Sequence, residues 1–360
     1  MNFSELLATQ VERGASDIHL HVGLPPLARV NGRLSPIGEA KLTPAFTEKL
    51  VDVMCDERQK RAFQEKFQVD LAYSVPGLAR FRTNLFRQRG SVSAVMRVIT
   101  SDEERLKVVN LPQDTIDYVR DKEQGIVLVT GPTGSGKTTT LAGALDQLNT
   151  IERKLISIED PVEYQIEGVN QIAVNAAIGL TFASVLRSVL RHDPDVIVVG
   201  ELRDGETAEI AINAALTGHL VLATVHTNTA SGAAPRLIDM GVDPALLRST
   251  LRLSVAQRLV RQLCDDCKAP DTPPSGLKSA WKAVGCDQCS GTGYRGRVGV
   301  FEFVDMKDEL SDILKPGVAA SEVEKLARKK KMASIRDDAL AKIEAGITSA
   351  AEVDRVLGVI

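Results

Sequence analysis

The sequence is poor in aromatic residues and in net charge, and it has no long apolar run. Aromatic residues make up 4% of the chain, so the hydrophobic cores must be mostly aliphatic and few rings can stack on nucleic-acid bases. A formal net charge of -3 gives no global electrostatic reason to bind nucleic acid, and we expect no nucleic-acid partner. No apolar stretch approaches the ~18 residues of a membrane-spanning helix.

Export and disulfide bonding are also not expected. The first residues, MNFSELLATQVERG, carry acidic side chains and lack the apolar core of a secretory signal. The chain contains five cysteines, of which four form two close pairs near the C-terminus and Cys55 stands alone in a helical pattern. Without an export signal, paired cysteines indicate a metal site more than disulfides. We therefore expect a cytosolic protein of bacterial type.

The first hundred residues have the pattern of a β-rich domain. IHLHV alternates with Ile18, Leu20 and Val22 on one face, and the Asn-Gly pair in RVNGRL predicts a two-residue hairpin. A helical segment is expected over 41–67, followed by strands in LARFRTNLF and VSAVMRVIT. The charged stretch SDEERLKVVNLPQ then predicts a domain linker.

After residue 125 the pattern becomes that of an α/β domain. Short, continuous apolar runs alternate with helical segments, which is typical of parallel strands buried on both faces. The runs are GIVLVT, KLISIE, DVIVVGE and HLVLATVH. With 360 residues, several domains are expected. We predict an N-terminal domain over 1–112, an α/β core over 113–261, a cysteine module over 262–298 and a helical subdomain over 299–360.

A phosphate-binding loop follows the first of these runs. GPTGSGKT fits GxxxxGK[ST] completely, between a strand and a helical segment, as this motif requires. Its glycines let backbone N–H groups converge on phosphate at the positive end of the helix. Lys137 would reach the β- and γ-phosphates of ATP, and Thr138 would ligate Mg²⁺. The predicted ATP-binding residues are Gly131, Pro132, Thr133, Gly134, Ser135, Gly136, Lys137, Thr138 and Thr139.

Acidic residues and a histidine follow the other apolar runs. Because ligands bind beyond the carboxyl ends of parallel strands, these groups should surround the same phosphate site. Glu201 would act near Mg²⁺ or the attacking water, and His226 as a sensor of the γ-phosphate. Glu163 would act as a general base or position the water. Helix capping or solvation is the alternative for the acids, above all for Asp160. His219 is as readily explained by a structural role.

The cysteines have the spacing C-x2-C-x18-C-x2-C, with members Cys264, Cys267, Cys286 and Cys289. Two such pairs can converge on one tetrahedral S₄ site, which predicts structural Zn²⁺. Redox dithiols are the alternative, but no thioredoxin-like βαβ pattern surrounds them.

Four segments together resemble the ATPases of bacterial type II secretion and type IV pili. GPTGSGKTTTL resembles their Walker A, EDPVEY their Asp box, and the run from DPDVIVVGE to ATVHTN their Walker B and His box. GASDIHLHVGLPPLARVNGRL resembles the start of their N-terminal domain. The resemblance implies a homohexameric ATPase, cytoplasmic and peripheral at the inner membrane. It also implies a PAS-like domain hinged to a RecA-like domain, with nucleotide between them.

The resemblance also assigns roles to single residues. Glu201 matches the Walker B glutamate and Glu163 the Asp box glutamate. Arg82 and Arg97 lie in strands like those that direct arginines toward the nucleotide, although a solvated or structural role stays open for both. His19 and His21 share one strand face, where an exposed polar surface is favoured over a metal site.

The resemblance further separates the branches of this family. The tetracysteine element and the tail DDALAKIEAGITSAAEVDRVLG resemble the secretion and pilus-assembly branch, whereas the compact start resembles the retraction ATPases. The leading hypothesis is a motor that extrudes pilin or pseudopilin through an inner-membrane platform protein, with a membrane-recruitment partner. The alternatives are a retraction ATPase, a non-hydrolysing nucleotide-binding scaffold and, weakly, a nucleic-acid motor.

Overall fold

The computed structural model describes residues 3–30, 32–99 and 113–358. Contacts within the chain divide it into two compact units, Met1–Arg105 and Leu106–Ile360, and each is described by itself. The predicted linker lies almost wholly outside the described residues, and the four predicted domain boundaries stay predictions. In the described part of the chain, no helix is long and apolar enough to cross a membrane.

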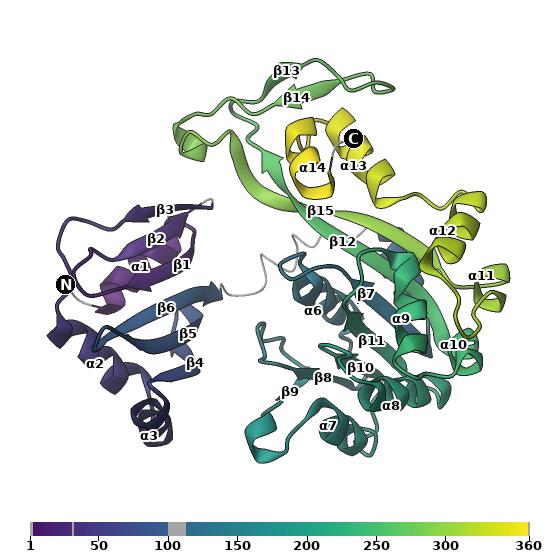
Figure 1. Ribbon diagram of the computed structural model, residues 1–360, viewed down its shortest axis with the longest axis horizontal. Helices are drawn as coiled ribbons and strands as arrows, with labels where there is room; N and C mark the ends of the chain where they lie inside the picture. Colours follow the sequence, from purple (N-terminus) through teal and green to yellow (C-terminus); the bar gives the residue numbers. More distant parts are fainter. Residues whose placement is uncertain (1–2, 31, 100–112, 359–360) are drawn as a thin grey trace. The chain divides into compact units, whose positions relative to one another are not determined.

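The N-terminal unit is built on a six-stranded antiparallel sheet in the order β3-β2-β1-β6-β5-β4 (Figure 1). The predicted alternation in IHLHV is confirmed within β1, because Ile18 and Leu20 are fully buried while His19 between them is not. Val22 lies beyond the end of the strand and is half-buried. Val30 pairs with Arg33, as the predicted hairpin requires. The strands are β1 (Ala15–Leu20), β2 (Leu27–Val30), β3 (Arg33–Pro36), β4 (Gln68–Val75), β5 (Ala79–Gln88) and β6 (Ser91–Ile99).

Three helices pack on this sheet, and one prediction is corrected here. The helical segment expected over 41–67 is two helices, interrupted at Cys55 and Asp56. The Asp56 side chain accepts from Gln59 N at 2.7 Å while the Gln59 side chain accepts from Asp56 N, a capping box that starts a new helix. Cys55 is therefore a buried cap residue and not an interior helix residue. The helices are α1 (Phe3–Glu12), α2 (Pro44–Met54) and α3 (Glu57–Lys66).

The C-terminal unit contains a seven-stranded sheet in the order β15-β12-β7-β11-β10-β8-β9. The four apolar runs form β7, β8, β10 and β11, all parallel, so the predicted mixed α/β fold with a parallel core is confirmed. Only β15 within this sheet is antiparallel, to β12. The strands are β7 (Gly125–Thr130), β8 (Leu155–Glu159), β9 (Asn170–Ala173), β10 (Val196–Val199), β11 (Leu220–Val225), β12 (Leu251–Leu263) and β15 (Tyr294–Asp305).

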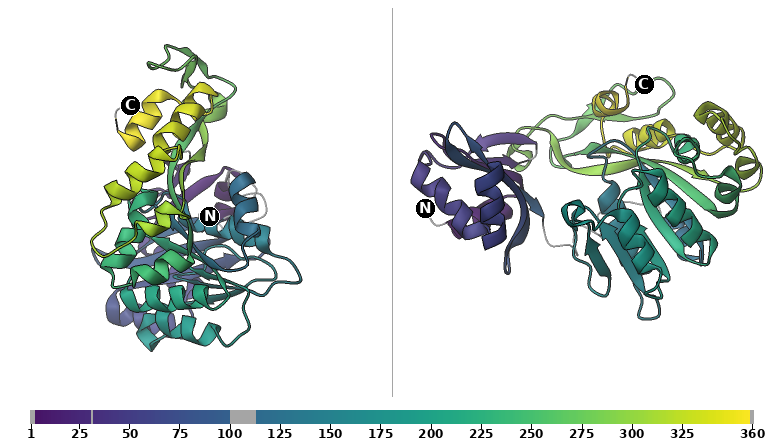
Figure 2. Two further views of the ribbon diagram at one scale, coloured as in Figure 1. Left: turned by 90° about the vertical axis from the view of Figure 1, so that its right-hand side faces the viewer. Right: turned by 60° about the horizontal axis from the view of Figure 1, so that its bottom comes forward.

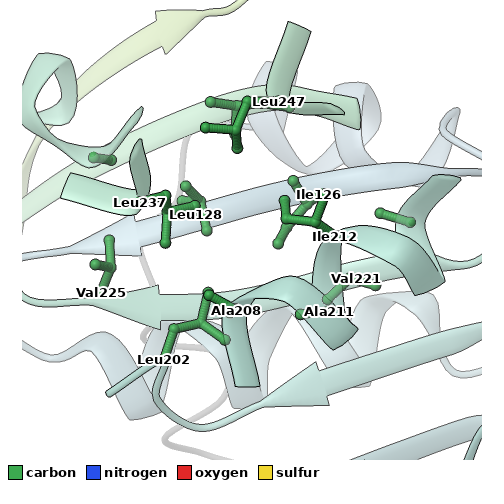
Figure 3. Close-up of a cluster of buried hydrophobic side chains, with 14 of the residues drawn as sticks. Ile126, Leu128, Leu202, Ala208, Ala211, Ile212, Val221, Val225, Leu237 and Leu247 are labelled. Atoms are coloured by element: carbon green, nitrogen blue, oxygen red, sulfur yellow. The ribbon is translucent and has the colours of Figure 1, made fainter. Parts of the chain in front are cut away.

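Helices cover both faces of this sheet, which explains why its strands are continuously apolar. On one face, Ile126 and Leu128 of β7 pack with Ile212 of α8, Leu237 of α9 and Leu247 of α10 (Figure 3). On the other face, alternate residues of β7 pack against α6. The helices of this part are α5 (Gln113–Arg120), α6 (Lys137–Leu148), α7 (Phe182–Val189), α8 (Gly205–Leu216), α9 (Ala233–Asp239) and α10 (Pro244–Thr250).

The strands β12 and β15 form a long ribbon that carries the cysteine segment and the last helices. Figure 1 and Figure 2 show the final, yellow helices lying along this ribbon. The cysteine segment contains a short hairpin, β13 (Ala269–Asp271) with β14 (Ala280–Lys282). The helices are α11 (Glu309–Asp312), α12 (Ala320–Lys329), α13 (Ile335–Glu344) and α14 (Ala350–Leu357).

An ion cluster around one buried carboxylate connects α14 to this ribbon. The carboxylate of Glu352 is completely buried and accepts from the backbone N–H and the guanidinium of Arg261, at 2.7–2.9 Å. Arg355 contacts the same carboxylate at 2.6 Å. Burial alone would raise the pKa of Glu352, but the hydrogen bonds from both arginines outweigh it and lower the pKa to about 2.

Replacing Glu352 by alanine is expected to destabilise the protein by about 2–3 kcal/mol, because the backbone N–H of Arg261 and two partly exposed guanidinium groups would lose a charged hydrogen-bond acceptor. Since the folded pKa is depressed, the stabilisation is present above the ordinary value near 4.5 and is lost as pH falls toward 2. Urea unfolding at pH 7 and at pH 3 measures both effects. Glu324→Ala, which removes an exposed carboxylate 3.9 Å from Arg328, is the control and should change stability by less than ~1 kcal/mol. Equal losses in both variants would contradict the role of Glu352.

Candidate active site

The phosphate loop connects β7 to α6 and is shaped by its glycines. Gly131, Gly134 and Gly136 have φ values of 148°, 80° and 92°, a region that side chains with a Cβ rarely adopt. A Cβ on Gly131 would lie 2.6 Å from the carbonyl oxygen of Gln257 on β12. Gly136 caps α6 without a side-chain hydrogen bond, so the first N–H groups of the helix remain available to an anion.

Lys137 is held by the loop itself. Its ammonium donates to the carbonyl of Gly131 at 2.7 Å and to that of Pro132 at 3.1 Å. Burial lowers the pKa of Lys137, and the negative charge of Glu201 opposes this shift.

The threonines after Lys137 connect α6 to its surroundings. Thr139 shares a hydrogen bond of 2.9 Å with the hydroxyl of Tyr164, and Thr140 donates to the Gln257 side chain at 2.7 Å. Thr138 lines a small cavity of about 30 Å³ between α6 and the segment after β8, together with Glu159. Its role toward Mg²⁺ stays a prediction.

The strands that carry the other predicted groups lie next to each other and end at one level. Val225 of β11 pairs with Thr130 of β7, and Val199 of β10 pairs with both Ala223 of β11 and Ile158 of β8. The side chains that follow these strands therefore gather at the edge of the sheet where the phosphate loop begins.

Glu201 and His226 are in direct contact at this edge. The Glu201 Oε1 atom lies 2.9 Å from His226 Nε2, while Oε2 accepts from Arg203 Nε at 2.7 Å. Arg203 also contacts Asp160 at 3.2 Å. Asp160 is thus part of an ion cluster and not only a solvated acid. Sequence reasoning missed Arg203; its only signal was its position two residues after Glu201.

The acidic residues at the end of β8 and in the loop after it have different surroundings. Glu159 accepts from Ser157 at 2.6 Å and from Gln171 at 3.0 Å, so a polar network fixes its carboxylate. Gln171 also donates to the carbonyl of Tyr164 at 2.7 Å, which orders the loop between β8 and β9. Glu163 lies half-buried in this loop, and its role as a base stays a prediction. Neither Gln171 nor Tyr164 was predicted from the sequence.

His219 lies away from this edge. It precedes β11, and its Nδ1 atom lies 2.9 Å from the carbonyl of Ala214 at the end of α8. The amino ends of the strands lie there, opposite the phosphate loop. This position favours the structural role left open for His219.

Arg82 and Arg97 lie in the other unit, as partners across β5 and β6. Both are exposed, and Arg97 contacts Asp17 at 3.0 Å. Their predicted role toward nucleotide stays a prediction. His19 and His21 do share one strand face, with ring centres 6.2 Å apart. They are half-buried and not exposed as expected, and burial lowers the pKa of both.

The four clustered cysteines satisfy the geometry of a tetrahedral thiolate site. All four sulfur atoms lie within 4.8 Å of one another, with distances of 3.8–3.9 Å between neighbouring pairs. A tetrahedron with Zn–S bonds of about 2.3 Å has S–S edges of ~3.8 Å. The members are Cys264, Cys267, Cys286 and Cys289.

The surroundings of these sulfur atoms shift their pKa values in different directions. Burial raises the pKa of Cys264 to about 12 and also raises that of Cys267. Burial raises the pKa of Cys289, but N–H groups of Cys286 and Gly293 donate to its sulfur at 3.1 Å and lower the pKa to about 6. Gly285 N donates to Cys267 at 3.3 Å and opposes the effect of burial there without reversing it. Four sulfur atoms at tetrahedral spacing are the donor set of a structural Zn²⁺ site, where the metal itself stabilises the thiolate form.

The family model described as Type II/IV secretion system protein matches residues 4–355. The chain belongs to this family. The resemblance inferred from the motifs is thereby confirmed.

Individual relatives agree with this assignment. The chain is 39% identical to the Type II secretion system ATPase E of Vibrio cholerae, over 98% of this chain and 74% of the relative. It is 37% identical to the Type IV pilus assembly ATPase PilB of Myxococcus xanthus, over 97% and 66%. The solved structure of the pilus retraction motor PilT with bound ADP aligns with a TM-score of 0.79 and 32% identity, over 99% of this chain and 96% of that one. The chain is an ATPase of the secretion and pilus class.

Proposed function

We propose that this protein is a hexameric motor that hydrolyses Mg²⁺-ATP to drive type II secretion or type IV pilus assembly. The observation that carries the proposal is the convergence of the phosphate loop, Glu201 and His226 at one edge of the sheet. Lys137 and Thr138 would hold the β- and γ-phosphates and the metal, Glu201 would act on the metal or the attacking water, and Glu163 would serve as the base. Arg82 and Arg97 would neutralise phosphate charge in the transition state.

The output of the motor is proposed to be extrusion of pilin or pseudopilin subunits. Hydrolysis would change the angle between the two units, and an inner-membrane platform protein would receive this motion, with a recruitment protein holding the ring at the membrane. The tetracysteine site and the relatives from secretion and pilus assembly support this branch.

Retraction of a pilus is the second candidate, favoured by the alignment with the retraction motor over nearly the whole of both chains. A deletion strain separates the two. Loss of secretion or of pili indicates the assembly branch, whereas excess pili would indicate retraction.

The biochemical part of the proposal predicts ATPase activity of the full-length chain that requires Mg²⁺ and is not stimulated by DNA. Phosphate release with and without EDTA and DNA measures this, and light scattering after size-exclusion chromatography with ATP measures the ring. Stimulation by DNA, or turnover in the absence of divalent metal, would contradict the proposal.

A further inference from the structure

Arg203 joins the two acidic segments of the proposed active site. Its Nε donates to Glu201 Oε2 at 2.7 Å, and its NH1 group donates to Asp160 Oδ2 at 3.2 Å. Glu201 follows β10, whereas Asp160 follows β8 and precedes Glu163 by three residues. One side chain therefore connects the segment of the Walker B glutamate with the loop of the Asp box glutamate.

The side chain of Arg203 is 54% exposed, and specific contacts define its position. Its neighbour Leu202 is buried, and the Leu202 N–H donates to the carbonyl of Thr224 on β11 at 2.9 Å, which fixes the backbone. The guanidinium lies over the ring of Phe182, 5.9 Å from its centre, and Phe182 is itself buried on α7. A guanidinium can stack on a ring while separate N–H groups bind two acids; an ammonium cannot reproduce this geometry.

These contacts give the two oxygen atoms of Glu201 different roles. Oε2 is bound by a permanently charged guanidinium that Asp160 and Phe182 also hold. Oε1 contacts only an imidazole among the hydrogen-bond partners described, that of His226 at 2.9 Å. If a water molecule took the place of the His226 imidazole at Oε1, the hydrogen bond from Arg203 to Oε2 would remain.

We propose that Arg203 is a positioning residue for hydrolysis. It orients Glu201 so that Oε1 faces the attacking water or the metal's water shell. Through its bond to Asp160 it also fixes the position of the loop that carries Glu163 relative to Glu201. The inference rests on the proposed role of Glu201. It differs from a phosphate-binding role, because Arg203 acts through Glu201 and is not required for nucleotide affinity.

The substitution Arg203→Gln is expected to lower kcat for ATP by about 10–100-fold while KM stays within about twofold, because a displaced catalytic group slows the chemical step more than binding. Arg203→Lys, which preserves the charge but not the two-acid geometry, should recover only part of the activity. The control is Arg120→Gln. Arg120 lies on α5, before the amino end of β7, and forms a similar surface ion pair with Asp117 at 3.0 Å. This variant should leave kcat unchanged. Melting temperatures and titration with a fluorescent ATP analogue complete the set.

Asp160→Asn tests the hydrogen bond between Arg203 and Asp160. It should lower kcat by about 3–10-fold, and its effect should be much smaller when Arg203 is already glutamine, because residues in one ion cluster are not additive. Additive losses would overturn the link between the two segments.

The outcomes separate this inference from the proposed function. If wild-type protein hydrolyses ATP and Glu201→Gln does not, the proposed function stands. Three results for Arg203→Gln would then overturn the positioning role alone: a kcat within twofold of wild type, a higher kcat, or a lower kcat/KM caused only by a higher KM. If Arg203→Gln does not fold, Arg203→Lys decides by the same criteria. Full activity in the lysine variant would show that charge suffices and would overturn the geometric argument.

Discussion

Glutamine in place of Glu201 is expected to lower kcat for ATP hydrolysis by about 10²–10⁴-fold, the range typical of losing an acid–base group. The amide has the same size and can still accept from Arg203, but it lacks the charge needed to polarise a water molecule or to stabilise the metal's water shell. Because the phosphate loop and Lys137 stay intact, affinity for nucleotide should change little. Steady-state phosphate release and titration with a fluorescent ATP analogue measure the two quantities.

The matched control is Glu48→Gln in the N-terminal unit. Glu48 is also a partly exposed glutamate paired with an arginine, Arg87, at 3.0 Å. This variant should hydrolyse ATP at the wild-type rate. Unchanged turnover in Glu201→Gln would count heavily against the assigned site, and loss of nucleotide binding would show that Glu201 supports the loop and not the reaction.

The central part of this site was predictable because local patterns determine it. The phosphate loop is one continuous motif, and the apolar runs before Glu201 and His226 are long enough to predict buried parallel strands. In such a sheet the carboxyl ends lie at one edge, so proximity of these groups follows from topology. The direct contact of Glu201 with His226 at 2.9 Å also depends on the pairing of β10 with β11, which the patterns alone did not determine.

Arg203, Gln171 and Gln257 were missed because their roles depend on contacts between distant segments. Gln257 supports the phosphate loop from β12, more than a hundred residues away in sequence. An arginine or glutamine at an isolated position has no periodicity or spacing that separates such a role from a solvated one. The interruption at Cys55 was missed for a different reason, since a capping box can also lie inside a longer apolar pattern.

Zinc bound by the four cysteines is expected at one ion per chain in protein purified without chelator. Cys286→Ser should abolish it, because three thiolates without the fourth lose the closed coordination of a structural site. If the loss of zinc lowers the free energy of unfolding by about 3 kcal/mol, the melting temperature should fall by about 6–12 °C. Metal analysis by plasma mass spectrometry and thermal unfolding measure these effects. Cys55→Ser removes the other thiol of the chain and should keep the zinc.

The expected effect on activity is smaller than the effect on stability. The cysteine segment is attached to the end of β12 at Leu263, six residues beyond Gln257, and six residues of strand span ~20 Å. Contacts between the segment and the last helices, such as Lys268 Nζ with the carbonyl of Gly346 at 3.1 Å, should be lost before the support of the phosphate loop. Zinc-free protein should therefore unfold at lower temperature while retaining most of its kcat below that temperature. Metal-free protein with an unchanged melting temperature would show that the four thiols are not a structural site.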